Sequence, residues 1–186
     1  MESDENERTP LHWAASNGDI QTVRDRLDAC DDPNKGDDGG WTPLISAASC
    51  GYTHIVACLL DSGANPSLKT KQGRDAFFYA VARCNGPMTD LFFQNDYHSW
   101  KQDSTGSSCI HRAICCEKCS PSFLDLLKSN DAPFDVPDGD GNLPIHLACY
   151  ENKPEIIKWL VEKCRFDTKS PKNNEGKVPK DLLPVA

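Results

Sequence analysis

A motif of four residues, Thr9-Pro10-Leu11-His12, returns 33 residues later as Thr42-Pro43-Leu44-Ile45. Further steps of 33 and 35 residues reach degenerate copies that begin at Asp75, Ser108, Leu143 and Val178. A glycine stands two residues before each later start, at Gly40, Gly73, Gly106, Gly141 and Gly176. Glycine at a fixed place indicates a tight turn with positive φ, and a following Thr-Pro pair is typical of a helix start. The chain is therefore predicted to be an array of repeated helical hairpins.

A period of 33 residues that opens with Thr-Pro-Leu-His is typical of ankyrin repeats. We predict an all-α fold, an ankyrin-repeat solenoid of helix-turn-helix units with short β-hairpin turns, forming a single domain over residues 1–186. The predicted repeats span about 9–41, 42–74, 75–107, 108–142 and 143–177, with a half-repeat C-terminal cap at 178–186. In repeat two, Ala47-Ala48 mark an inner helix, and Ile55-Val56 with Leu59-Leu60 mark an outer helix. Stability is expected to be collective, because one repeat cannot bury both of its faces.

The charge balance limits the class of partner. With 28 acidic and 20 basic side chains the net charge is −8, which argues against binding to duplex nucleic acid or to an anionic membrane. The longest run without polar residues is about seven, against roughly 20 for a membrane span. The acidic N-terminus lacks the features of a secretory signal. We therefore expect a protein of the cytoplasm, and also of the nucleus, that binds neither nucleic acid nor membrane. A monomer is expected, because ankyrin arrays with capped ends usually need no self-association.

Three histidines, His12, His111 and His146, occupy the same place in their repeats. Repetition favours a structural role, because an imidazole at this place can bridge the backbones of adjacent hairpins. A catalytic histidine would need a nucleophile and an orienting acid, and neither recurs at a matching spacing. The chain also lacks a phosphate-binding glycine loop. We predict a protein that is not an enzyme and uses no cofactor.

The cysteines are the best candidates for metal or redox chemistry. Cys116 and Cys119 form a C-x-x-C pair beside Cys115, but a structural zinc site usually needs a second such pair, which the chain lacks. Free thiols near an interhelical loop are the favoured interpretation, and a redox or zinc module is the remaining alternative. Several acidic residues suit turns better than calcium loops, because their side chains bond nearby backbone and no twelve-residue calcium loop is present: Asp31, Asp32, Asp37, Asp38, Asp135, Asp138 and Asp140. No metal site is predicted.

Without a catalytic set, the concave face of the predicted array is the candidate binding surface. Its hairpin tips and inner helices carry arginines and aromatic residues, the types that dominate interface hot spots. The predicted partner-binding residues are Arg8, Trp13, Trp41, Arg74, Tyr79, Arg83 and Arg112. Trp41 stands out, because a tryptophan on a turn tip buries little surface unless something covers it. The arginines predict a protein partner with an acidic surface and an association that weakens with salt.

The segments Arg8–Ala14, Asp37–Leu44, Ile110–Ala113 and Gly141–Cys149 carry a more specific resemblance. In order and register they resemble the gankyrin family of ankyrin-repeat proteins, which are proteasome assembly chaperones. The resemblance implies a non-enzymatic chaperone that cradles the C-terminal domain of one ATPase subunit of the proteasome regulatory particle during base assembly. The positions that match the family's binding residues are Arg8, Trp13, Trp41, Arg83 and Arg112.

The chain departs from the family in two respects. It is expected to begin at the family's second repeat, and repeat three replaces Thr-Pro-Leu-His by Asp75-Ala76-Phe77-Phe78. Repeat three also lacks the Gly-Ala stop and carries Tyr97-His98-Ser99-Trp100 instead. The alternative function is an ankyrin adaptor or kinase inhibitor with a different protein client, since one fold serves many functions.

Overall fold

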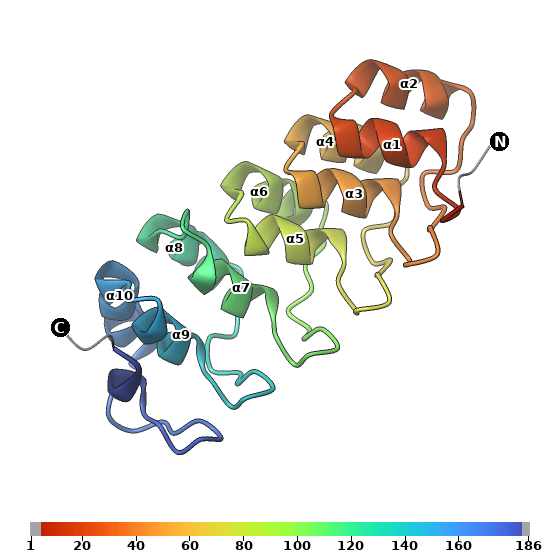
Figure 1. Cartoon of the computed structure of the whole chain (residues 1–186). Coiled ribbons are helices and arrows are strands. Elements are labelled where there is room, and N and C mark those ends of the chain that lie inside the picture. The colour runs from red at the N-terminus through yellow and green to blue at the C-terminus, as the bar shows by residue number, and fades with distance from the viewer. Residues whose placement is uncertain (1–4, 184–186) are drawn as a thin grey trace. The chain divides into compact units, whose positions relative to one another are not determined.

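The computed structural model describes residues 5–183 and is built from short helices joined by turns (Figure 1). The helices are α1 (Pro10–Asn17), α2 (Ile20–Asp28), α3 (Pro43–Cys50), α4 (Thr53–Asp61), α5 (Ala76–Ala82), α6 (Gly86–Gln94), α7 (Cys109–Cys115), α8 (Pro121–Ser129), α9 (Pro144–Tyr150), α10 (Pro154–Cys164) and the 3-10 helix η1 (Pro179–Leu182). Over residues 5–183 none of the hairpin segments forms a regular β-strand. The predicted all-α ankyrin-repeat fold is confirmed, with two helices in each predicted repeat.

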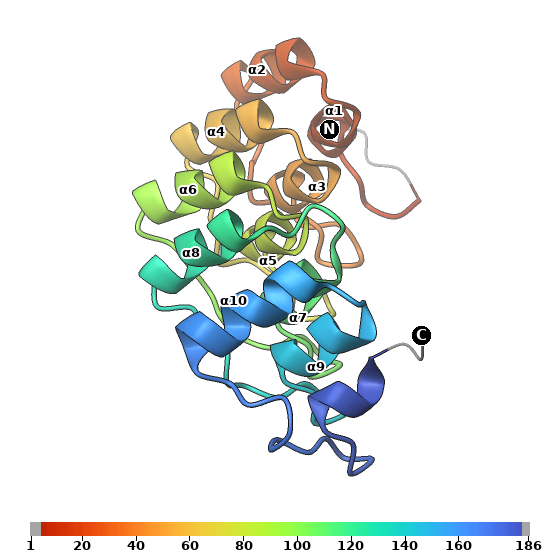
Figure 2. The same cartoon turned by 90° about the vertical axis from the view of Figure 1, so that its left-hand side faces the viewer.

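The chain divides into two compact units. The first runs to Ala80 and resumes over Asn85–Ser99, and the second holds Val81–Cys84 and continues from Trp100. In the first unit the inner helices α1 and α3 lie side by side, and the outer helices α2, α4 and α6 form a second row behind them (Figure 2). In the second unit α7 packs against α9, α8 against α10, and η1 against α9. The prediction of a single domain over residues 1–186 stays a prediction.

The predicted helix starts are confirmed where the motif is intact. Helices α1 and α3 begin at Pro10 and Pro43, each after a threonine with extended backbone. The hydroxyl of Thr42 accepts a hydrogen bond from the Ile45 N–H at 3.2 Å. Proline at this place fixes φ and loses no hydrogen bond, because the first helical N–H groups have no partner within the helix.

Each hairpin turn has the same backbone geometry. The predicted turn glycines all have positive φ, between 76° and 79°. In the first turn the Gly40 N–H donates to the Asp37 carbonyl at 2.8 Å, and the Asp37 N–H donates to the Trp41 carbonyl at 2.8 Å. A Cβ on Gly40 would lie 2.8 Å from the Lys69 carbonyl oxygen, so both the positive φ and the close approach require glycine here.

The side chain that closes each turn stands three residues before its glycine. The Asp37 carboxylate accepts the N–H groups of Gly39 and Trp41, both at 2.8 Å. The carboxylate of Asp138 accepts the Asp140 and Asn142 N–H groups in the same way. The prediction that acidic residues here form turns is confirmed for Asp37 and Asp138, whose side chains bond the backbone of their own turns.

The core of the first unit changes character along the chain. Around α1 and α3 it consists of aliphatic and small side chains, such as Leu11 and Ala47, both fully buried. At α5 and α6 it becomes aromatic: the buried Phe77 ring lies 6.0 Å from Phe92 and 6.4 Å from Tyr97 between ring centroids. These near-perpendicular ring contacts add about 0.5–1.5 kcal/mol each beyond the burial of area.

Candidate partner-binding face

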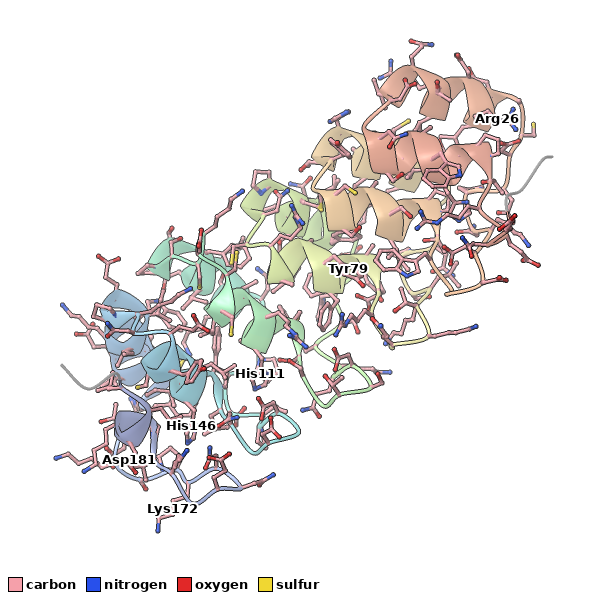
Figure 3. All side chains as sticks on the ribbon, in the orientation of Figure 1. Arg26, Tyr79, His111, His146, Lys172 and Asp181 are labelled. Atoms are coloured by element: carbon pink, nitrogen blue, oxygen red, sulfur yellow. The ribbon has the colours of Figure 1, made fainter. Side chains whose placement is uncertain are left out.

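The recurring histidines bridge successive hairpins, as predicted. The Thr9 N–H donates to His12 Nδ1 at 3.0 Å, so the ring carries its proton on Nε2, which donates to the Trp41 carbonyl at 3.0 Å. His111 joins Ser108 and Asn142 in the same way, and His146 joins Leu143 and Pro171. Burial lowers the pKa of all three histidines. Figure 3 shows His111 and His146 at the hairpin side of their inner helices. Both ring nitrogens are occupied by structural bonds.

Repeat three replaces the histidine bridge with a buried carboxylate. Asp75 caps α5, accepting the Phe78 N–H at 2.8 Å, and its second oxygen accepts the Tyr97 hydroxyl at 2.9 Å. Burial raises the pKa of Asp75, and burial together with the nearby Asp75 charge raises the pKa of Tyr97. The departure from the consensus motif at Asp75 therefore comes with its own partner, Tyr97, in the same repeat.

Arg8 is held in place by the first hairpin turn. Its Nε donates to the Asp37 carboxylate at 3.1 Å, and its guanidinium carbon lies 5.1 Å from the centre of the Trp13 ring. Trp13 keeps 45% of its surface exposed. An arginine that is stacked on an aromatic ring and fixed by a carboxylate loses little rotamer freedom when it binds a partner. The structure thus brings the predicted residues Arg8, which is half-buried, and Trp13, which is exposed, together as one pair.

Trp41 is covered by a neighbour from its own unit. Its ring lies 5.2 Å from the Tyr79 ring with an interplanar angle of 34°, and both side chains are half-buried. Figure 3 shows Tyr79 on α5, on the side from which the hairpin loops extend. The sequence predicted that a partner protein would cover Trp41. In the structure Tyr79 of the same chain covers part of its ring. Both residues still keep part of their surface exposed.

Arg74 forms a second cation–aromatic pair in the first unit. Its guanidinium carbon lies 5.3 Å from the centre of the Phe78 ring. The face is interrupted at Ser46, which occupies the same repeat position as Trp13 and Tyr79 and is 2% exposed. The first unit thus carries five of the predicted residues in two clusters, Arg8 with Trp13, and Trp41, Tyr79 and Arg74 around α5.

The second unit holds the two remaining predicted residues, Arg83 and Arg112, both exposed. Arg112 lines a cleft of about 340 Å³ with Ser107, Leu147 and the Asp138–Asp140 turn. A neighbouring cleft of about 360 Å³ is lined by Asn142, Leu147, Tyr150, Lys177 and Leu182, among others. The acidic turn makes the surroundings of Arg112 mixed in charge rather than purely basic.

Tyr150 is a surface residue outside the predicted partner-binding set. It ends α9 and is 66% exposed, more than any other large hydrophobic side chain over residues 5–183. An aromatic residue at the last position of an inner helix was the available signal. Large exposed aromatic side chains mark interaction surfaces, so Tyr150 extends the candidate face of the second unit.

The structure gives no support to a metal centre or a membrane span. Among residues 5–183 no three histidine, cysteine or acidic side chains come together as metal ligands. The cysteines of that range are free thiols, and Cys115, at the end of α7, is exposed. Within the same range, every helix is too short or too polar to cross a bilayer.

Comparison with known families agrees with the fold. A family model of ankyrin repeats in three copies matches residues 1–70, and another of ankyrin repeats in many copies matches residues 113–161. The two matches together cover more than half of the chain. The protein belongs to the ankyrin-repeat family, whose members act as protein-interaction modules.

Among curated proteins, two proteasome subunits are similar to the chain. It is 57% identical to the 26S proteasome non-ATPase regulatory subunit 10 of Dictyostelium discoideum over 63 residues, 33% of this chain and 27% of that protein. It is 27% identical to the probable 26S proteasome regulatory subunit p28 of Saccharomyces cerevisiae over 169 residues, 88% of this chain and 73% of that protein.

The chain is also 31% identical to the palmitoyltransferase AKR1 of Lachancea kluyveri over 157 residues, 82% of this chain but only 21% of that protein. The matches to the Dictyostelium subunit and to this enzyme thus cover about a quarter or less of those proteins. The relationship to the proteasome subunits is the more specific one, because a single short match reaches 57% identity.

Proposed function

We propose that the protein is a non-enzymatic assembly chaperone that binds the C-terminal domain of an ATPase subunit of the proteasome regulatory particle. The observation that carries the proposal is the fixed cation–aromatic surface of the first unit, Arg8 on Trp13 beside the Trp41–Tyr79 stack. The match to the probable regulatory subunit p28 covers 88% of the chain, which supports the proposal. Such a chaperone would act as a monomer in the cytoplasm and nucleus.

The physical basis is binding of an acidic surface by positioned arginines. Arg8 is already oriented by Asp37, and Arg74 by the Phe78 ring, so forked bonds to partner carboxylates cost little conformational entropy. The exposed rings of Trp13 and Tyr150 offer apolar area that a partner can bury. Exposed charges dominate the encounter, so association is expected to slow and weaken as the salt concentration rises.

The test is titration calorimetry of the full chain against purified C-terminal domains of the regulatory-particle ATPases. The double variant Trp41→Ala/Arg83→Glu removes one aromatic anchor and reverses one exposed charge. Loss of one such anchor typically costs about 2 kcal/mol or more of binding free energy. The matched control is Arg24→Glu, which reverses an exposed arginine on the outer helix α2 and should leave affinity unchanged.

The outcomes separate the proposal from its alternative. Tight binding of one ATPase domain that the double variant loses and Arg24→Glu retains supports both the function and the face. Equal affinity of the unmodified chain, the double variant and Arg24→Glu for the ATPase domain would show that the proposed face is not the binding surface. Absence of binding to every ATPase domain, together with inhibition of a protein kinase by the same chain, would establish the kinase-inhibitor alternative instead.

A further inference from the structure

Three cysteines of the second unit lie around the C-terminal end of α7. The thiol of Cys84 is 3.5 Å from the Ala113 carbonyl oxygen. The same carbonyl accepts the Cys116 N–H at 3.0 Å, and the Cys116 carbonyl accepts the Cys119 N–H at 3.0 Å. All three residues are half-buried, so each keeps some surface in contact with solvent. The helix end thus gathers cysteines that are separated by 35 residues in the chain.

Cys119 is the main side-chain partner of Cys84. Cys84 makes a side-chain hydrogen bond with Cys119 and a weaker one with Cys116. The thiol of Cys84 therefore has the Ala113 carbonyl and two sulfur atoms around it, and of the two sulfurs Cys119 interacts with it more strongly. Sulfur atoms at hydrogen-bond range can reach bonding distance by small side-chain rotations, without the backbone movement that remote cysteines require.

The surroundings shift the pKa values of Cys84 and Cys119 in opposite directions. The hydrogen bond from Cys84, helped by the charge of Lys153, lowers the pKa of Cys119 against the effect of burial. Lys153 is fixed beside the helix end, where its ammonium donates to the carbonyls of Ile114 at 2.8 Å and Cys116 at 2.6 Å. The hydrogen bond with Cys119 and burial raise the pKa of Cys84. Cys119 is thus the better nucleophile and Cys84 the protonated neighbour.

We propose that Cys84 and Cys119 are an oxidation site at which hydrogen peroxide forms a reversible disulfide. The Cys119 thiolate attacks one peroxide oxygen, the O–O bond breaks, and the departing hydroxide takes a proton to become water. The resulting sulfenic acid is attacked at sulfur by Cys84, which loses its proton as the S–O bond breaks and a second water leaves. Two thiols are oxidised, and one peroxide is reduced to two waters.

The disulfide would join the interhelical loops of repeats three and four. Arg83, one of the proposed partner-binding residues, directly precedes Cys84 in one of these loops. The oxidation site itself does not depend on the proposed function, because no partner takes part in the reaction.

Tryptic mapping of the full chain tests the proposal, because trypsin cleaves after Arg83, Arg112 and Lys118. The chain is treated with hydrogen peroxide, its remaining thiols are alkylated, and it is digested without reduction. Each candidate sulfur then lies on its own fragment: Cys84 on 84–101, Cys119 on 119–128, and Cys116 with Cys115 on 113–118. The expected product is fragment 84–101 linked to 119–128, which a reductant separates.

Variants identify the role of each sulfur. Cys84→Ser should abolish the link and leave a sulfenic acid on Cys119 that dimedone traps, whereas Cys116→Ser should retain the link. Cys58→Ser, which removes a half-buried thiol of the first unit, is the matched control and should also retain it. Linkage of 113–118 to 84–101 or to 119–128, linkage only between molecules, or alkylation of Cys119 no faster than of Cys164 would overturn the proposal. The mapping of the unmodified chain decides the question even where a variant folds poorly.

Discussion

Repeats one and three have the same backbone arrangement, but different side chains cap the first helix of each repeat. In repeat one a threonine and a histidine make the cap, and His12 reaches the next hairpin through the Trp41 carbonyl. In repeat three Asp75 makes the cap alone, and Tyr97 from the end of the same repeat supplies its second partner. The two repeats therefore share the positions of their helices and turns, but different side chains form the hydrogen bonds to their buried polar groups.

The aromatic cluster around Phe77 is the feature of repeat three that we expect to contribute most to stability. Phe77 is fully buried against Phe92, Phe93 and Tyr97. Phe77→Ala should lower the free energy of unfolding by about 3–5 kcal/mol, because it removes the ring and leaves a cavity. Urea unfolding followed by circular dichroism measures the change. Phe93→Ala, at a half-buried ring of the same cluster, is the control and should cost clearly less. Equal losses would show that the cluster is not organised around Phe77.

The histidine bridge of repeat one comes next in expected effect. His12→Ala leaves the Thr9 N–H and the Trp41 carbonyl without their buried partner, so we expect a loss of about 2 kcal/mol. The same unfolding measurement applies, with His54→Ala on the exposed side of α4 as control, expected within about 0.5 kcal/mol of the parent. A loss for His12→Ala no larger than for the control would show that water replaces the bridge at no cost.

The sequence was sufficient where structure is set by nearby residues. The turn glycines, the Thr-Pro helix starts and the histidine bridges were all predictable, because each depends on a short motif repeated at a fixed period. The bridging role of His12 followed from its repetition rather than from its own chemistry.

The sequence was insufficient where contacts join different repeats. The Trp41–Tyr79 stack joins residues 38 positions apart, and the approach of Cys84 to Cys119 spans 35. Periodicity gives the place of each residue in its repeat but does not show which side chains turn toward each other. For this reason Cys84 was absent from the predicted cysteine group. Tyr150 is different: its place at the end of an inner helix is visible in the sequence, but its exposure depends on the packing around it.

The three histidine bridges also predict how stability depends on pH. Burial holds the pKa of His12, His111 and His146 below the ordinary value of about 6.5. The unfolded chain therefore takes up protons first as the pH falls below about 6.5, and stability present above that pH is lost. For one histidine the effect should be smaller than loss of the ring, because protonation at Nδ1 leaves the Nε2–H donation intact. Unfolding by urea at pH 7.5 and 5.5 checks this, and His12→Gln should flatten the dependence. An unchanged slope in that variant would contradict the assignment.

The smallest expected effect compares two capping aspartates of the first unit that have opposite pKa directions. Burial raises the pKa of Asp75, so its stability contribution is greatest when the carboxyl is protonated and declines as the pH rises above about 3.9. Hydrogen bonds from Thr22 lower the pKa of the exposed Asp19, so its contribution is present above that pH and is lost in acid.

Replacing each aspartate by asparagine keeps an oxygen acceptor for the helix cap and removes the charge. Relative to the parent, Asp75→Asn should therefore gain stability as the pH rises from 4 to 7, by about 1 kcal/mol or less after loss of the charge-assisted bond from Tyr97. Asp19→Asn should lose stability over the same range. Unfolding curves of both variants at the two pH values decide the matter: if both move in the same direction, Asp75 is not held in the folded state as a carboxyl that resists ionisation.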